Sequence, residues 1–164
     1  MGMLRLVALI ASVITSACTM PAGTATPDPA AGPGEIAFRL GGAGGAAIVV
    51  PVSLNGKGPY DFVLDTGATL TCLDESLAEE LSLARVPGVI GRGATLGSSG
   101  PVGLRRLDSI SIGEARSTDV TVCTLDLANI RAMGLEVRGL LGLNVLKAYT
   151  VTLDFKRNVL SLQP

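Results

Sequence analysis

One aspartate of this chain stands where a carboxylate could do chemistry. Residues 62–69 read FVLDTGAT, so Asp65 directly follows three apolar residues and Gly67 comes two positions later. The apolar run predicts a buried strand, and the glycine permits a sharp turn after it. The pattern therefore predicts a carboxylate that passes from a buried strand into an open loop. An ordinary surface turn built from the same residue types is the other interpretation.

The residue types that are absent exclude several kinds of catalytic and metal site. The 164 residues include no histidine and only three cysteines. Ser–His and Cys–His catalytic pairs are therefore excluded, and three scattered cysteines do not suffice for a metal site. The glycines of residues 42–47 imitate part of a dinucleotide motif, but apolar residues typical of a strand follow them instead of a helix. We expect neither a metal nor a cofactor, and chemistry based on carboxylates, hydroxyls, lysine or backbone groups.

Charge and composition limit the partners. The chain has 13 basic and 14 acidic residues, a net charge of −1, and no basic stripe, because basic residues are adjacent only at Arg105–Arg106 and Lys156–Arg157. Nucleic acid is therefore not an expected partner. Hydrophobic residues make up 48% of the chain and charged residues 16%, which suits a packed core. The length fits one folded domain with a modest tail.

The N-terminal part predicts export and a lipid anchor. Residues 1–17 have the charged start and short apolar run of a signal peptide, and this run is shorter than the roughly 20 residues that span a bilayer. Residues 15–18, TSAC, resemble a bacterial lipobox with Thr15 in place of leucine, which predicts lipidation of Cys18. Ordinary export with cleavage nearby, or an uncleaved anchor, is the alternative.

This N-terminal pattern also predicts the domain organisation and the location. Residues 18–34 are rich in proline, alanine and glycine and predict an unfolded tether, which leaves residues 35–164 as the folded domain. We expect an exported lipoprotein, anchored in a membrane and facing the periplasm or the cell exterior. In such an oxidising compartment Cys72 and Cys123 could form a disulfide. Two buried, reduced cysteines that pack as small hydrophobic residues are the alternative.

Strand patterns dominate the folded part. Alternation or β-branched runs predict strands at residues 35–40, 47–54, 60–64 and 120–125 and a hairpin over residues 149–162. Pro51 predicts that its strand lies at a sheet edge. Residues 74–81, with acidic residues first and an apolar face, predict the one helix. We therefore expect an all-β domain, a small closed barrel with one short helix.

The chain resembles a known family through three of its segments. These are residues 62–68, the predicted helix at 74–81, and the segment LLGLNVL at residues 140–146, and together they are similar to the retropepsin-like aspartic proteases. The resemblance covers about residues 36–162 and implies a closed, mostly antiparallel barrel in which one chain is half of an enzyme. Only one D-T-G triplet is present, so a site with two aspartates requires a homodimer.

The resemblance also implies roles around Asp65. Thr66 would join the two loops of the dimer, and Gly67 would let the substrate backbone approach, with Ala68 and Thr69 completing the loop. Ala68 lacks the hydroxyl that pepsin-like relatives often have, which predicts a mildly acidic optimum. The implied flap tip comprises Gly97, Ser98, Ser99 and Gly100, and the implied pocket comprises Leu140, Leu141 and Gly142.

The sequence thus predicts an aspartic endopeptidase that cleaves extended peptides with apolar side chains beside the cut bond. An Asp65 pair would activate the attacking water. The alternative is a non-catalytic peptide-binding or scaffold lipoprotein with the same fold. A structural lipoprotein with a chance D-T-G is a third interpretation. The intact triplet favours the enzyme, because a binding module has no need to keep a carboxylate in that setting.

Overall fold

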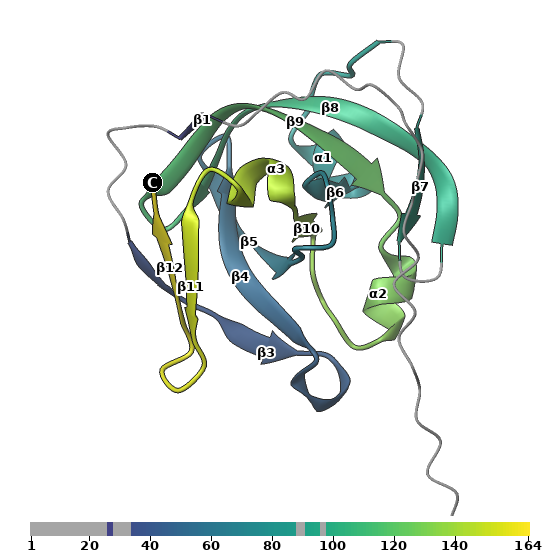
Figure 1. Cartoon of the computed structure of the whole chain (residues 1–164). Coiled ribbons are helices and arrows are strands. Elements are labelled where there is room, and N and C mark those ends of the chain that lie inside the picture. The colour runs from purple at the N-terminus through teal and green to yellow at the C-terminus, as the bar shows by residue number, and fades with distance from the viewer. Residues whose placement is uncertain (1–25, 28–33, 88–90, 96–97) are drawn as a thin grey trace, which may run out of the picture.

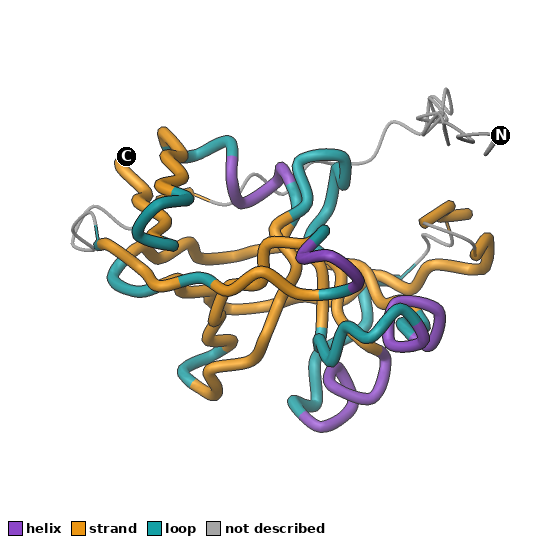
Figure 2. Tube along the Cα trace, turned by 90° about the horizontal axis from the view of Figure 1, so that it is seen from below, coloured by secondary structure: helices purple, strands orange, loops and turns teal. Residues whose placement is uncertain are grey.

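The computed structural model describes residues 26–27, 34–87, 91–95 and 98–164. Strands dominate the described chain, and the helices between them are short (Figures 1 and 2). The strands are β1 (Thr26–Pro27), β2 (Glu35–Ala37), β3 (Arg39–Gly41), β4 (Ala47–Leu54), β5 (Lys57–Leu64), β6 (Cys72–Asp74), β7 (Gly91–Thr95), β8 (Ser98–Ile112), β9 (Ala115–Leu125), β10 (Gly139–Leu141), β11 (Thr150–Asp154) and β12 (Val159–Gln163). The helices are η1 (Ala43–Gly45), α1 (Glu75–Glu80), α2 (Ala128–Ala132) and α3 (Leu143–Leu146).

Six strands close into a barrel. Their order is β9-β6-β10-β5-β4-β8, and β8 pairs back with β9. The β5–β10 and β6–β9 pairs are parallel, and the other four are antiparallel. Closure leaves none of these six strands as a free sheet edge along its whole length. The predicted closed and mostly antiparallel β fold is confirmed.

A second sheet of three strands lies beside the barrel in the order β11-β12-β2. Its β2 corresponds to the first half of the strand predicted at residues 35–40, whereas β3, the second half, pairs with β4 in the barrel sheet. The division falls at Phe38, which is buried and whose N–H donates to the carbonyl of Asn158. The prediction of one strand was therefore wrong, because the chain changes sheets at this residue.

The main hydrophobic core fills the barrel. Alternate residues of β4, namely Val50, Val52 and Leu54, point into it together with Phe62 of β5. The two strands are joined at Asn55 and Gly56, whose φ angles of 50° and 75° are typical of a tight hairpin turn. The connection between the strands predicted at residues 47–54 and 60–64 is therefore shorter than expected, because β5 already begins at Lys57.

The prediction from Pro51 was also wrong. Strand β4 is not an edge strand, because it lies between β5 and β8 in the barrel. On its β8 side, however, β4 pairs with β3 only at residues 47–49 and with β8 only at residues 53–54. Pro51 lies between these two paired stretches, so among the described residues it has no partner strand on this side. A residue without an N–H donor is tolerated there.

The described residues form more helices than the one that the sequence predicted. Helix α1 confirms the helix expected at residues 74–81, but α2 and α3 were not predicted, and each is too short to carry a clear amphipathic period. No helix among the described residues is long and apolar enough to cross a membrane. The predicted signal peptide and Cys18 lie outside the described residues. In the predicted tether, Thr26 and Pro27 pair with Thr118 and Ser117 of β9.

Candidate active site

Asp65 lies at the end of β5, where the strand leaves the barrel wall. Strand β10 runs parallel to β5 and pairs Leu141 with Leu64. One residue further, the N–H of Asp65 donates to the carbonyl of Leu141 over 3.0 Å. The backbone of Asp65 is thereby held to the barrel, while its side chain is half-buried at the surface. This confirms the carboxylate expected at the junction of a strand and a loop.

The segment from Asp65 to Thr69, called the Asp65 loop below, turns back on itself. The N–H of Gly67 donates to Oδ1 of Asp65 over 2.8 Å, and the N–H of Ala68 donates to the Asp65 carbonyl over 3.2 Å. The other carboxylate oxygen makes no hydrogen bond to the residues that the structure describes. One oxygen is thus oriented by the loop, and the other is available to a water, a substrate or a second carboxyl group.

The start of α3 supports the Asp65 loop from behind. The N–H of Leu143 donates to the carbonyl of Ala68 over 2.8 Å, and the N–H of Asn144 donates to that of Thr69 over 3.1 Å. These are N–H groups of the first turn of a helix, which have no partner within the helix itself. The carbonyls of the loop therefore supply hydrogen-bond acceptors to the first N–H groups of α3, and the same bonds hold the loop in place.

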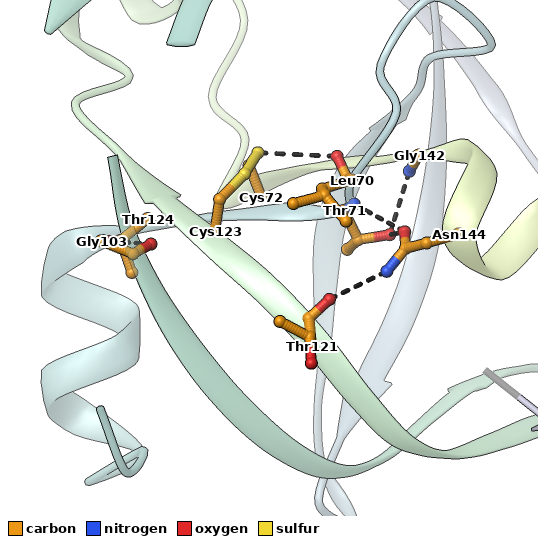
Figure 3. Close-up of a disulfide and its surroundings, with 9 residues drawn as sticks. All are labelled: Leu70, Thr71, Cys72, Gly103, Thr121, Cys123, Thr124, Gly142 and Asn144. Carbon is orange, nitrogen blue, oxygen red and sulfur yellow. Dashed lines mark hydrogen bonds between the residues drawn. A yellow bond between two sulfur atoms is a disulfide. The ribbon is translucent and has the colours of Figure 1, made fainter. Parts of the chain in front are cut away.

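A buried amide holds α3 in place. Oδ1 of Asn144 accepts hydrogen bonds from the N–H and the hydroxyl of Thr71, over 2.7 and 2.9 Å, and Nδ2 donates to the Thr121 carbonyl over 2.9 Å (Figure 3). The Thr71 hydroxyl also accepts from the N–H of Gly142 over 3.0 Å. Asn144 thus joins β9 and the residue that precedes β6 to α3, with both ends of its amide paired.

The predicted pocket residues have a different role. Leu140 and Leu141 are buried in two hydrophobic clusters, with 4% and 0% of their surface exposed. A Cβ atom at Gly142 would lie 2.5 Å from the carbonyl carbon and oxygen of Leu70, so only glycine fits there. The pocket prediction was therefore wrong for these side chains, because β10 lies inside the barrel wall. They position the Asp65 loop and do not line a surface pocket.

The segment that contains the implied flap forms a hairpin of β7 and β8, and three of the four implied tip residues lie in β8. Strand β7 pairs with β8 from Gly91 opposite Val102 to Thr95 opposite Ser98. The two residues between Thr95 and Ser98, one of them the implied tip residue Gly97, lie outside the described residues. Ser98, Ser99 and Gly100 belong to strand β8 instead of the turn. The β7–β8 ladder thus includes Ser98, Ser99 and Gly100, which the glycine and serine content had led us to expect in the turn.

An ion pair between a buried arginine and a half-buried glutamate lies where this hairpin joins the barrel. Arg105 of β8 is only 4% exposed, and its guanidinium donates to Oε1 of Glu75 at the start of α1. Arg85 approaches the same carboxylate oxygen at 3.7 Å. A hydrogen bond from Thr124 and the contact with Arg105 hold the pKa of Glu75 below its ordinary value. The pair thus ties α1 to the hairpin strand and to β9.

The described residues place the Asp65 carboxylate on a loop that α3 holds against the end of β5. The structure places Thr66, Gly67 and Thr69 on the exposed side of the Asp65 loop, as the sequence suggested. Thr71 and Asn144 are the supporting residues whose role the sequence analysis missed. A polar residue inside the apolar run LLGLNVL was the available signal. No group of potential ligands for a metal ion occurs among the described residues.

We expect replacement of Asn144 to destabilise the fold through this network. Asn144→Ala leaves the Thr71 N–H and the Thr121 carbonyl buried without partners and should lower the free energy of unfolding by about 3 kcal/mol. Asn144→Asp keeps the acceptor for Thr71, but it places a carboxylate against the Thr121 carbonyl and should also destabilise. Urea unfolding measures both effects. A loss below about 0.5 kcal/mol for Asn144→Ala would contradict the network.

We expect Glu75 to contribute to the acid sensitivity of folding. Its pKa is lowered in the folded state, so its contribution is complete above the unfolded value and is lost as the pH falls through the folded value. Between about pH 5 and pH 3, the wild type should therefore lose more stability than Glu75→Gln. The matched control is Glu79→Gln, an exposed glutamate of the same helix, which should follow the wild type. Identical urea midpoints for wild type and Glu75→Gln across this range would contradict the expectation.

The geometry described above agrees with comparisons to known proteins. A family model described as aspartyl protease matches residues 50–145, which include Asp65, Thr71 and Asn144. No curated protein matches the chain.

Among solved structures, the chain is similar to a retropepsin-like aspartic protease from Rickettsia conorii. The TM-score is 0.53 at 20% identity, over 79% of this chain and 90% of that one. It is also similar to the retroviral protease-like domain of Ddi1 from Leishmania major, with a TM-score of 0.44 at 18% identity over 71% and 92% of the two chains. Because the family model spans more than half of the sequence, the chain belongs to the aspartyl protease family, and its fold is retropepsin-like.

Proposed function

We propose that this chain is an aspartic endopeptidase whose active site is completed by Asp65 of a second copy. The observation that carries the proposal is the state of the Asp65 carboxylate. One of its oxygens is oriented by the N–H of Gly67, and the other is unpaired among the described residues. The sequence contains one D-T-G triplet, so a second carboxyl group of the same kind must come from a second chain.

The chemistry follows from two carboxyl groups at close range. Two carboxylates a few ångströms apart cannot both ionise without strong repulsion, so the pair holds one proton, as in aspartic proteases generally. The ionised member takes a proton from a bound water, and the resulting oxygen nucleophile attacks the peptide carbonyl. The protonated member donates a hydrogen bond to the oxyanion that develops. The proton then passes to the leaving amine as the C–N bond breaks.

The exposed part of the Asp65 loop supports a two-fold assembly. Thr66 is exposed, and its hydroxyl makes no hydrogen bond to the part of the chain that the structure describes. A homodimer with its axis between the two Asp65 residues would bring the two Thr66 residues together as well. The β7–β8 hairpin would serve as the flap that closes over an extended peptide and excludes water.

The decisive variant is Asp65→Asn in the full chain. Asparagine keeps an oxygen that can accept from Gly67 but cannot act as the base, so cleavage should fall at least about a thousandfold while folding and dimerisation persist. A digest of a broad peptide library between about pH 3 and pH 7, with pepstatin as inhibitor, measures the cleavage. Light scattering measures the dimer.

The matched control is Asp108→Asn, which makes the same chemical change at an exposed residue of β8 and should cleave like the wild type. Cleavage by Asp65→Asn at the wild-type rate would refute the proposed mechanism. Cleavage by a chain that stays monomeric at every concentration would refute the shared site. A folded wild type that binds peptides without cutting them would favour the non-catalytic peptide-binding lipoprotein.

We also propose that the enzyme is tethered to a membrane facing the periplasm or the cell exterior through lipid on Cys18, a proposal supported by the sequence pattern of residues 1–34. In a bacterial host, labelled fatty acid should enter the wild type, and the protein should fractionate with membranes. Cys18→Ala should lose the label. Incorporation of label into Cys18→Ala, or an unlabelled wild type, would contradict the anchor.

A further inference from the structure

We propose that the disulfide between Cys72 and Cys123 positions the Asp65 loop. The two cysteines face each other in the parallel pair of β6 and β9, with their Cα atoms 4.4 Å apart (Figure 3). Both are almost completely buried, at 6% and 4% exposure. The inference deepens the proposed function, on which its activity measurement rests.

The disulfide joins the two chain segments that hold the amide of Asn144. On one side, Cys72 directly follows Thr71, which donates twice to Asn144. On the other side, Cys123 lies two residues after Thr121, whose carbonyl accepts from Nδ2 of Asn144. The N–H of Cys123 also donates to the Thr71 carbonyl over 2.9 Å. Separation of β6 from β9 would therefore break both sides of the amide network.

The consequence reaches Asp65 through α3. When the Asn144 amide is held, the N–H groups of Leu143 and Asn144 reach the carbonyls of Ala68 and Thr69. These two bonds are the ones that fix the far half of the Asp65 loop. The disulfide therefore acts on the loop through Asn144, and it does not touch the carboxylate.

The same disulfide also lies at the base of the hairpin. Cys72 and Cys123 form a small hydrophobic cluster with Val102 and Leu104 of β8, and Leu70 packs against it. Leu70 directly follows the Asp65 loop in the sequence. One cross-link thus joins the strand that carries the proposed flap to the end of the loop that carries the aspartate.

Chain entropy explains why a cross-link is useful at this position. The cysteines are 51 residues apart in the sequence, and the segment between them contains α1 and the whole β7–β8 hairpin. Bringing the ends of so long a segment together costs conformational entropy, and a disulfide removes most of that cost by restricting the open states. Strand β6 has only three residues, so its own ladder bonds resist separation weakly.

The test uses the full chain and the variant Cys72→Ala/Cys123→Ala, with Cys18 unchanged. Hydrogen exchange should become at least about tenfold faster at the N–H groups of Leu143 and Asn144, relative to that of Val50 in the core of the barrel. In the peptide-cleavage assay, kcat should fall more than KM rises, because a misplaced carboxyl group impairs the chemical step more than peptide binding.

The matched control is Val120→Ala, which removes buried volume from the same strand β9, while its side chain belongs to the main core and not to the cysteine cluster. Val120→Ala should accelerate hydrogen exchange to a similar extent across the barrel, with no larger effect at the N–H groups of Leu143 and Asn144. The variant Cys72→Ala/Cys123→Val restores packing volume without the cross-link and should behave like the double alanine variant. Wild-type exchange in this volume-restoring variant would show that packing suffices, and would overturn the proposal.

If the double variant does not fold, the disulfide of the folded wild type can be reduced chemically instead. A small dithiol gives two electrons and two protons to the disulfide, which becomes two thiols, while the dithiol closes into its own cyclic disulfide. Reduction of the folded wild type should produce the same selective exchange. Uniform or unchanged exchange overturns the inference. A wild type that cleaves no peptide but shows the selective exchange refutes the proposed function and leaves the cross-link's role standing.

Discussion

The hydrogen bonding of one buried amide governs where the Asp65 carboxylate can be. Asn144 is 6% exposed, and its side chain joins Thr71, the Thr121 carbonyl and the first turn of α3. Each of these groups is buried or half-buried and would be costly to leave unpaired. The arrangement satisfies all of these groups at once, and the Asp65 loop is bonded to it through the N–H groups at the start of α3.

Parallel strand pairing makes this geometry possible. A closed barrel of antiparallel hairpins alone would place each loop beside its own neighbours in sequence. Here β10 inserts between β5 and β6, parallel to one and antiparallel to the other, so residues about 75 positions apart become adjacent. Gly139 begins this strand and Gly142 follows it, and side chains at either position would collide with Phe62 or with the Leu70 backbone. The close approach of backbones is what puts the Leu141 carbonyl within reach of the Asp65 N–H.

The parts of the fold that could be read from residue patterns share a local cause. Alternating and β-branched residues placed β4 correctly, and the same reasoning placed the β11–β12 hairpin to within one residue at each end. Helix α1 followed from its acidic first turn. The failures were non-local. Phe38 divides a strand because its N–H donates to the carbonyl of Asn158 beside the second sheet. The Cys72–Cys123 pairing, which the sequence left open, depends on two strands that are distant in sequence.

At the candidate site, the residue types predicted that the Asp65 carboxylate would follow a strand and that Gly67 would turn the chain. The sequence also established that one chain holds one D-T-G triplet. These are properties of short segments, which local sterics and hydrophobic periodicity control. The burial of Leu140 and Leu141, the partners of Asn144 and the disulfide became evident from the folded barrel alone. Such contacts depend on how β10 and β9 are threaded past β6, and no short segment of the chain carries that information.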